Sequence, residues 1–275
     1  MATLTLSAPA KLNLFLHILG KRSDGYHDLQ TYFQLLDYGD QLSFSLSDSL
    51  SLSGCPGVAT EENLVWRAAR ALQKHSNGKL GAEIHVEKKL PMGGGIGGGS
   101  SDAATTLLAL NHLWQLRLTT DELCQLGLRL GADLPIFIHG HSSLAHGIGE
   151  QLKPMSLPPK AFLVAWGPDQ VSTAHIFQHP DLTHQGLART IAAAIEQGHN
   201  DCQALVARLY PNIAKLLSLL GPKARLTGTG GCVFLPCSNL QQAEDIGRQL
   251  PSLYKFFVAN GTDRSICHQQ FAGFL

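Results

Sequence analysis

A glycine-rich segment carries the most evident chemistry in this sequence. Six of the seven residues from Gly93 to Gly99 are glycine, and Ser100 and Ser101 follow directly. Glycine lacks a Cβ atom, so the backbone can take positive φ angles and bring several N–H groups against an anion. Apolar residues then recur at helical spacing, and we expect a helix to begin at Ser101 or Asp102. The pattern predicts a phosphate-binding loop; composition alone also allows a flexible linker, which the buried helix disfavours.

Two other nucleotide motifs fit this segment less well. Gly93, Gly95 and Gly98 match the dinucleotide fingerprint G-x-G-x-x-G, but that motif should follow a buried parallel strand. Residues 82–89 instead alternate between apolar and polar, as a half-exposed strand does. A Walker loop ends in Gly-Lys-Ser or Gly-Lys-Thr, and here Gly99 is followed by serine. Both motifs are therefore disfavoured.

A lysine and an asparagine near the N-terminus form a second candidate. Residues 11–18 alternate like a β-strand, which places Lys11 and Asn13 on one face and leucine and isoleucine on the other. The two polar side chains would stand about 7 Å apart and point the same way. This spacing suits the wall of a binding site, with a solvent-exposed face as the alternative.

The bulk composition excludes several classes of protein. The chain has 275 residues, with 21 Lys and Arg against 21 Asp and Glu, so it lacks the basic field that drives nucleic-acid or acidic-membrane binding. Its six cysteines are scattered without a C-x-x-C pair, as in proteins of a reducing cytosol. Apolar runs of about 18 residues are also missing. We expect a cytoplasmic protein with a small-molecule substrate and neither nucleic-acid nor membrane partners.

The order of the expected elements indicates an α+β fold with two domains. Strands are expected at 11–18, 29–36, 41–46, 82–89, 161–166, 232–235 and 256–258, and helices at 63–73, 119–130, 187–195, 202–209, 213–220 and 240–250. A capping box of Thr119 and Glu122 opens the second of these helices. The prolines at 154, 158 and 159 interrupt the periodicity, so we expect domains at 1–154 and 155–275.

Three segments together resemble a known family. PAKLNL (9–14), the glycine-rich segment (91–104) and LTGTGGC (226–232) are similar, in this order, to the three motifs of the GHMP small-molecule kinases. GYH (25–27), LDYGD (36–40) and GADLP (131–135) resemble the branch that phosphorylates the tertiary 2-hydroxyl of a cytidine-diphosphate-linked methylerythritol in the non-mevalonate route to isoprenoid precursors. The resemblance implies a ribosomal-protein-S5-domain-2-like N-terminal domain and a ferredoxin-like C-terminal domain.

The resemblance also implies catalytic roles. Asp133 would be the base and Lys11 its cationic partner, since a carboxylate can take the proton of a poorly nucleophilic alcohol and an ammonium can stabilise the developing charge. Asp133, followed by Leu134 and Pro135, is equally a good helix N-cap, and both roles can hold together. For Lys11 the alternative is a solvated surface lysine.

In this family the glycine-rich segment wraps the phosphates of ATP, and Mg²⁺ arrives with the nucleotide. The residues expected to bind ATP are Asn63, Lys88, Pro91, Met92, Gly93, Gly94, Gly95, Ile96, Gly97, Gly98, Gly99, Ser100 and Ser101, with Leu64 and Trp66 beside the adenine. Asp102 would repel phosphate if it faced inward, so we expect it to point outward and favour the helix N-terminus.

The implied substrate residues surround a cytidine. They are Asn13, Tyr26, His27, Phe33, Phe177 and Thr229, with the aromatic rings stacking on the cytosine and His27 bonding its edge. His139, His141 and His146 suggest a metal site, but without a clustered carboxylate or cysteine we expect no resident metal.

Four functions remain to be separated. The leading one is the ATP-dependent kinase, as a monomer or weak homodimer. A catalytically silent sugar or nucleotide sensor, a kinase for mevalonate or homoserine, and an RNA-binding module are the alternatives. Retention of Lys11 and Asp133 disfavours the sensor, the Tyr26-His27 pair and Phe33 disfavour the small acids, and zero net charge disfavours RNA.

Overall fold

The computed structural model describes residues 3–55, 57–76, 78, 80–182 and 190–273. The strands are β1 (Leu4–Lys21), β2 (His27–Ser47), β3 (Ser51–Ser53), β4 (Gly81–Glu87), β5 (Ser143–Gly147), β6 (Gln151–Pro154), β7 (Ala161–Trp166), β8 (Arg225–Leu226), β9 (Cys232–Cys237) and β10 (Lys255–Thr262). The helices are α1 (Leu64–Gln73), α2 (Gly98–Leu113), α3 (Thr120–Leu128), α4 (Leu134–His139), α5 (Thr173–Gln178), α6 (Ile191–Gln197), α7 (Gln203–Leu209), α8 (Pro211–Leu220), α9 (Leu240–Arg248) and α10 (Ile266–Ala272), with two short 3₁₀ helices at Thr60–Glu62 and Lys74–Ser76.

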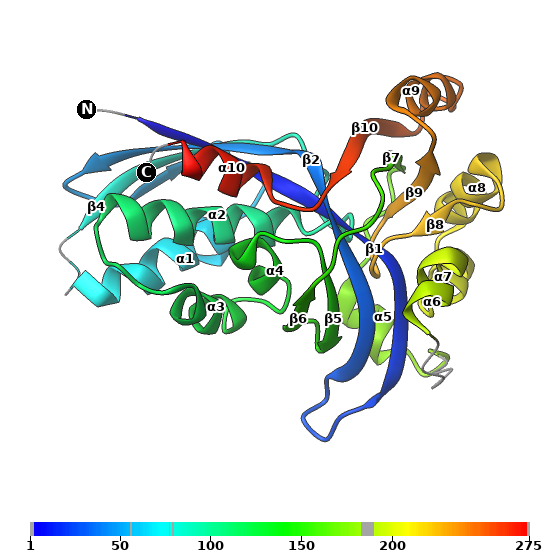
Figure 1. Ribbon diagram of the computed structural model, residues 1–275, viewed down its shortest axis with the longest axis horizontal. Coiled ribbons are helices and arrows are strands. Elements are labelled where there is room, and N and C mark those ends of the chain that lie inside the picture. Colours follow the sequence, from blue (N-terminus) through cyan, green and yellow to red (C-terminus); the bar gives the residue numbers. More distant parts are fainter. Residues whose placement is uncertain (1–2, 56, 77, 79, 183–189, 274–275) are drawn as a thin grey trace.

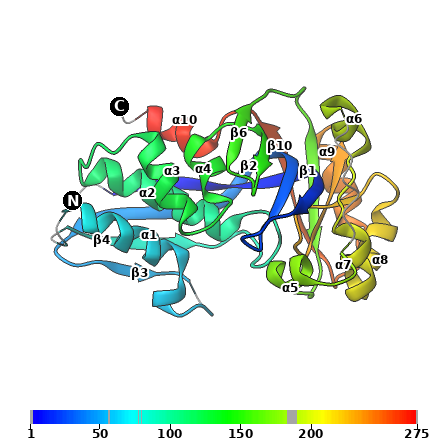
Figure 2. The same ribbon diagram turned by 90° about the horizontal axis from the view of Figure 1, so that it is seen from below.

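One mixed sheet connects the two halves of the molecule (Figure 1). Over the described residues its ten strands follow the order β3-β4-β2-β10-β7-β9-β8, with β1 paired to β2, β5 paired to β2 and β6 paired to β5. Helices α1 to α4 lie together beside the N-terminal part of the sheet, and α5 to α9 lie around β7 to β10 (Figures 1 and 2). The α+β prediction is confirmed.

Strands β1 and β2 form a long antiparallel hairpin that runs between the halves. Its register extends from Leu4 opposite Phe44 to Lys21 opposite His27. Two strands were expected at 29–36 and 41–46, and this is wrong: β2 is continuous because its other edge pairs in turn with β5, β10 and β4. The expectation that only one face of 11–18 is core is also wrong, since every residue from 11 to 18 is buried, on both faces of the strand.

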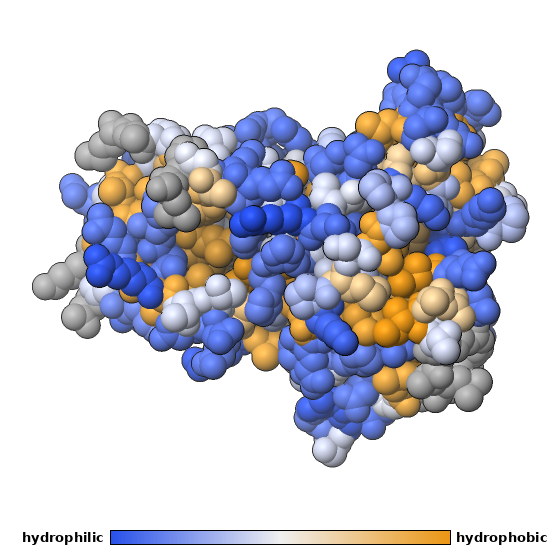
Figure 3. All heavy atoms as spheres, viewed as in Figure 1, coloured by the Kyte–Doolittle hydropathy of each residue, from blue (hydrophilic) through white to orange (hydrophobic). Residues whose placement is uncertain are grey.

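The core has one buried cluster in each half and a third, built from β1, β2, β7, β9 and β10, that joins them. One cluster joins β1, β2 and β4 to α1, α2 and α4, and it includes Cys267 of α10. A second joins β7 and β9 to α7 and α8, and it takes in Leu16 and Ile18 from β1. The division into domains at residue 154 stays a prediction. Helix α10 packs on the N-terminal half, so the described chain returns there after the C-terminal half. Hydrophilic residues cover most of the face in Figure 3, and hydrophobic ones gather near β1 and the helices beside it.

The helix boundaries confirm some signals and correct others. Thr119 caps α3, with the predicted capping box to Glu122. Helix α2 begins at Gly98, three or four residues before the expected start at Ser101 or Asp102. Gly97 at φ 76° turns the chain, and the Ser101 N–H already bonds to the Gly97 carbonyl oxygen at 2.8 Å. Helix α6 covers Ile191–Gln197, and the first part of the expected helix 187–195 lies outside the described residues.

Candidate functional site

Lys11 is buried at the centre of the molecule. A register shift between Pro9 and Lys11 breaks the pairing of β1 with β2, and the Lys11 N–H bonds instead to the Ile96 carbonyl oxygen at 3.0 Å. Its side chain is only 3% exposed, and its ammonium donates to Asn13 Oδ1 at 2.6 Å and to the Gly95 carbonyl oxygen at 3.1 Å. The surface-lysine alternative is therefore wrong, and the ammonium is fixed by neutral oxygens.

Asp133 faces this ammonium. Its Oδ2 lies 3.3 Å from Lys11 Nζ, and its side chain is 35% exposed. Asp133 occupies the N-cap position of α4, with Pro135 in the first turn, but its carboxylate accepts no capping hydrogen bond. Asp133 is thus the N-cap residue by its position in the backbone, while its carboxylate pairs with Lys11 in the site.

The glycine-rich segment is held in a conformation that side chains would disrupt. Gly97 has φ 76°, and a methyl group added there would lie 2.7 Å from the Phe137 ring. Gly95 has φ 74°, and a methyl group there would lie 2.3 Å from the Thr227 carbonyl oxygen. The flexible-linker alternative is wrong, because close packing fixes the segment. The N–H groups of the first turn of α2 have no partner inside the helix and are available to an anion.

The segment at 226–232 closes over this loop from the C-terminal half. The Gly231 N–H bonds to the Gly93 carbonyl oxygen at 3.1 Å, and the Cys232 N–H to that of Gly94 at 3.0 Å. Thr227 Oγ1 accepts the Asn13 N–H at 2.9 Å. The three sequence motifs therefore meet in space, and Thr227 of the third motif makes a contact, although the sequence indicated no individual role for it.

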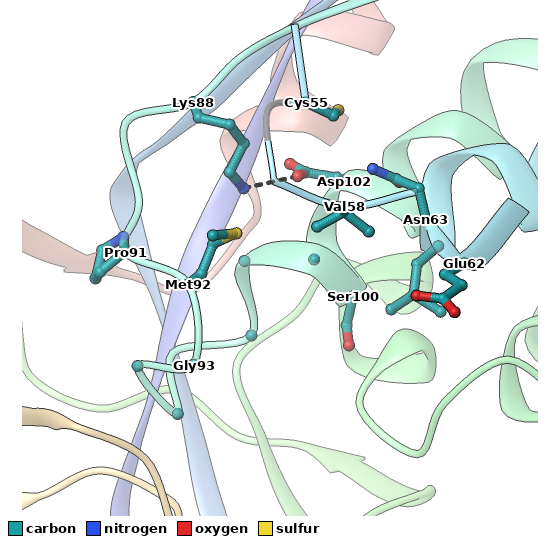
Figure 4. A pocket seen from close by; sticks show the side chains of 16 residues that line it. Cys55, Val58, Glu62, Asn63, Lys88, Pro91, Met92, Gly93, Ser100 and Asp102 are labelled. Atoms are coloured by element: carbon teal, nitrogen blue, oxygen red, sulfur yellow. Dashed lines mark hydrogen bonds and ion pairs between the residues drawn. The ribbon is translucent and has the colours of Figure 1, made fainter. Parts of the chain in front are cut away.

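A cavity of about 360 Å³ lies along the glycine-rich segment (Figure 4). We call it the loop cavity; its lining residues are Cys55, Val58, Glu62, Asn63, Leu64, Lys88, Pro91, Met92, Gly93, Gly94, Gly95, Gly97, Gly98, Gly99, Ser100 and Asp102. Most of the residues expected to bind ATP are brought together here. Ile96, Ser101 and Trp66 are not among them: the Ile96 and Ser101 side chains are buried. Asn63 also caps α1 by accepting the Val65 N–H at 2.9 Å.

Asp102 corrects one prediction. It points inward, is buried, and pairs through Oδ2 with Lys88 Nζ at 2.8 Å (Figure 4). Lys88 also pairs with the fully buried Asp40, so an ammonium compensates the acid that was expected to face outward. Burial, together with the charge of Asp40, raises the pKa of Asp102 although Lys88 lowers it. Burial lowers the pKa of Lys88, but the two carboxylates outweigh this and raise it.

A second cavity of about 260 Å³ opens beside Lys11. We call it the lysine cavity; its lining residues are Lys11, Asn13, Leu16, Leu29, Thr31, Phe33, Gly95, Ser100, Ala132, Asp133, Ile148, Thr173, Phe177, Gly228 and Thr229. Gly95 and Ser100 line both cavities, so a ligand group held at these residues reaches the Lys11–Asp133 pair. The alternating pattern of β1 gave no signal for Leu16, and Thr173 has no sequence context that marks it.

The expected substrate residues are only partly gathered in the lysine cavity. Phe177 lines it and stacks on His27, with ring centroids 5.3 Å apart. Phe33 lines it too, but its buried ring lies under Lys11, with Nζ 5.1 Å from the centroid. Thr229 lines it and bonds Thr173 through their hydroxyls at 2.8 Å. Tyr26 is 58% exposed and lies outside the cavity lining.

Two further features concern metals and membranes. Across the ranges that the structure describes, no group of three or more His, Cys, Asp or Glu side chains is placed to hold a metal ion together. Within the same residues, none of the helices combines the length and apolar character needed to cross a bilayer. All six cysteines are free thiols.

Comparison with known proteins yields two family models and close relatives. The GHMP kinases N-terminal domain matches residues 63–141, and the GHMP kinases C-terminal domain matches residues 181–255. The 4-diphosphocytidyl-2-C-methyl-D-erythritol kinase of Pseudomonas syringae pv. tomato is 51% identical over 276 residues, which cover 98% of each chain. The protein of that name from Alcanivorax borkumensis is 49% identical, over 97% of this chain and 93% of its own.

Solved structures agree with these relatives. A crystal structure of 4-(cytidine 5'-diphospho)-2C-methyl-D-erythritol kinase superposes with a TM-score of 0.81 at 30% identity, covering 94% of this chain and 100% of its own. The mevalonate kinase of Methanococcus jannaschii has a TM-score of 0.67 at 14% identity, over 95% of this chain and 98% of its own. At that identity the second likeness shows a common fold alone.

Proposed function

The chain belongs to the GHMP kinase family, and we propose that it transfers a phosphoryl group from ATP to the 2-hydroxyl of 4-(cytidine 5'-diphospho)-2-C-methyl-D-erythritol. Relatives 49% and 51% identical over nearly the whole chain are named as kinases of this compound, and a solved structure of the same name shares the fold. The reaction belongs to the non-mevalonate route to isoprenoid precursors. The observation that carries the proposal is the Lys11–Asp133 pair in a cavity that shares Gly95 and Ser100 with the loop cavity.

We assign the proton transfer to Asp133. Its carboxylate accepts the proton of the acceptor hydroxyl while the oxygen–phosphorus bond forms and ADP leaves with the bridging electron pair. Lys11 holds an ammonium 3.3 Å from that carboxylate and stabilises the negative charge that develops in the transition state. Asn13 Oδ1 and the Gly95 carbonyl oxygen fix the position of the ammonium, so it needs no reorganisation during the reaction.

The residues of the loop cavity fit a nucleoside triphosphate. ATP supplies the transferred phosphoryl group and brings Mg²⁺, which neutralises phosphate charge. Positive-φ glycines let backbone N–H groups approach an anion, and the first turn of α2 adds unpaired N–H groups and a partial positive charge. Ser100 offers a hydroxyl to a phosphate or to Mg²⁺, since Mg²⁺ prefers oxygen ligands. Asn63 and Leu64 would lie beside the base at the far end of the cavity.

We propose that the cytidine end of the acceptor binds next to Phe177 and His27. Phe177 forms an aromatic edge of the lysine cavity with its ring stacked on that of His27, and a pyrimidine can extend such a stack. Stacking on a base contributes about 1–3 kcal/mol, enough to make the cytidine a recognition handle. Tyr26, which directly precedes His27, is exposed and would have to move to cover the base. The Phe33 ring would support the Lys11 ammonium instead of the cytosine.

The test is ADP release with three acceptors under identical conditions: the cytidine-diphosphate-linked methylerythritol, mevalonate and homoserine. Turnover of the first compound alone is expected, because the two small acids leave the aromatic edge of the lysine cavity empty. Turnover of only mevalonate or homoserine would overturn the acceptor assignment. Binding of the cytidine compound without any ADP release would favour the sensor alternative instead.

The proposal includes a metal requirement, a compartment, an oligomeric state and a domain boundary. Activity should require Mg²⁺, so EDTA is expected to abolish ADP release and added Mg²⁺ to restore it. Six free thiols favour the cytoplasm as the compartment. We propose a monomer or weak homodimer, for which sedimentation at several protein concentrations is the measurement, and a domain division near residue 154.

A further inference from the structure

Asp40, which lies opposite Ala8 of β1 in the middle of β2, is a buried carboxylate with an unusual set of partners. Its Oδ1 accepts the backbone N–H groups of Lys89 at 2.5 Å and Leu90 at 2.8 Å, and its Oδ2 accepts the Lys88 ammonium. These donors belong to three consecutive residues that join β4 to Pro91. One fully buried side chain therefore holds the whole link that leads into the glycine-rich segment.

The same carboxylate also lies against the other end of the segment. A methyl group on Gly98, the first residue of α2, would lie 3.7 Å from Asp40 Oδ2. Asp102, one turn further along α2, shares the Lys88 ammonium with Asp40. The loop from Pro91 to Gly97 thus leaves and returns to a single charged cluster.

We propose that Asp40 is a positioning residue for nucleotide binding, which fixes the two ends of the glycine-rich segment so that its N–H groups stay arranged for the phosphates. The proposal rests on the function proposed above in taking the nucleotide to be ATP. A carboxylate suits the place because both oxygens accept and neither donates. An asparagine could serve either the two N–H groups or the ammonium through its single oxygen, and its NH₂ would face a donor on the other side.

The experiment compares Asp40→Asn and Asp40→Ala with Asp37→Asn as a matched control. Asp37 lies on the same strand and holds the Asn260 N–H at 2.7 Å and the Asn260 side chain at 2.8 Å, away from the glycine-rich segment. The measured quantities are kcat, KM for ATP, KM for the acceptor, and the calorimetric Kd for ADP. Amide hydrogen exchange of residues 89–99 is followed in the same proteins.

The Asp40 variants are expected to raise KM for ATP and Kd for ADP by about tenfold or more, as for loss of a hydrogen bond to a charged group. KM for the acceptor should stay within about twofold, and exchange at 89–99 should accelerate. The control should change neither nucleotide constant. A merely structural role would lower the active fraction, and so the apparent kcat, while leaving both nucleotide constants and the local exchange unchanged; that result would overturn the proposal.

Hydrogen exchange and ADP affinity still test the role of Asp40 if its variants do not fold or if the proposed acceptor is not phosphorylated. If the Asp40 variants do not fold, exchange in the unchanged protein decides: the Lys89 and Leu90 amides should be protected as strongly as those of β4, and rapid exchange would overturn the proposal. ADP affinity and exchange do not depend on the acceptor. Failure to phosphorylate the cytidine compound would therefore refute the proposed reaction and leave the positioning role of Asp40 standing.

Discussion

Replacement of Asp133 by asparagine tests the assignment of the base most directly. Asparagine keeps an oxygen that can accept from the Lys11 ammonium, which lies 3.3 Å from Asp133 Oδ2, but it cannot take a proton at neutral pH. A positioned general base contributes about 10²–10⁴ to the rate. The variant should therefore lose at least about a hundredfold in kcat, which corresponds to about 2.7 kcal/mol of transition-state stabilisation.

The fold should tolerate this change. Asp133 stands at the N-cap position of α4, where loss of a capping side chain usually costs about 0.5–2 kcal/mol, but its carboxylate accepts no capping bond. Its side chain is also partly exposed, so the free energy of unfolding should fall by less than about 1 kcal/mol. Urea denaturation measures this term, and ADP affinity should match the unchanged protein.

The assay is coupled ADP release at saturating ATP and acceptor. Asp121→Asn is the control, because Asp121 is an exposed carboxylate in the first turn of α3, away from both cavities. Turnover of the Asp133 variant within about tenfold of the unchanged protein would refute the base assignment, since positioning and charge stabilisation alone would then suffice. Loss of ADP binding would show instead that Asp133 supports the nucleotide site.

Three further changes probe the loop, the buried cluster and the aromatic edge. Gly97→Ala should destabilise more than Gly221→Ala and raise KM for ATP: both have positive φ, but only at Gly97 would the methyl group meet a ring carbon, at 2.7 Å. Equal urea midpoints and equal initial rates for the two variants would contradict this prediction, because packing at the loop would then be unimportant. Burial raises the pKa of Asp102 to about 7, so the folded state binds its proton more tightly than the unfolded chain; its stabilisation is present at low pH and is lost as pH rises from about 4 through about 7. Asp102→Asn should flatten the urea-measured unfolding free energy across this window, and an unchanged slope would contradict the assignment. Phe177→Ala should raise KM for the cytidine compound by about tenfold with KM for ATP unchanged, as loss of a base stack predicts; equal effects on both constants would count against it.

Local patterns predicted the elements well where one partner surface decides the structure. The capping box of α3 needs only residues 119–122, and the alternation of β4 reflects a single buried face. The division of β2 into two strands failed because its continuity depends on pairing with β4, β5 and β10, which come from distant parts of the chain. The start of α2 was missed because tertiary packing, not a capping side chain, fixes the turn at Gly97.

In the site, too, local patterns did not predict which side chains are placed by contacts with distant parts of the chain. Motif resemblance selected Lys11 and Asp133, and the structure brings them within 3.3 Å, but no pattern in the chain predicted that Ser101 would be buried or that Tyr26 would lie outside the cavity lining. The sequence places a helix boundary only to within one or two residues, so it could not decide which of Ser100 and Ser101 lines the cavity. The rule that an acid avoids a phosphate site failed at Asp102, since it ignored a compensating lysine 14 positions away.

The charges of the two lysines of the site, the buried Lys11 and the partly buried Lys88, are compensated differently, and this separates their roles. Lys88 lies between two carboxylates, so its cluster gains no positive charge that phosphates could use. Lys11 has one carboxylate, Asp133, and two neutral oxygen partners. When Asp133 accepts the proton, the Lys11 ammonium loses its counterion as negative charge develops beside it. A unit charge at about 4 Å contributes about 4 kcal/mol at an effective dielectric constant of about 20. We therefore infer that Lys11 stabilises the transferred group, whereas Lys88 keeps the cavity wall and the loop in place.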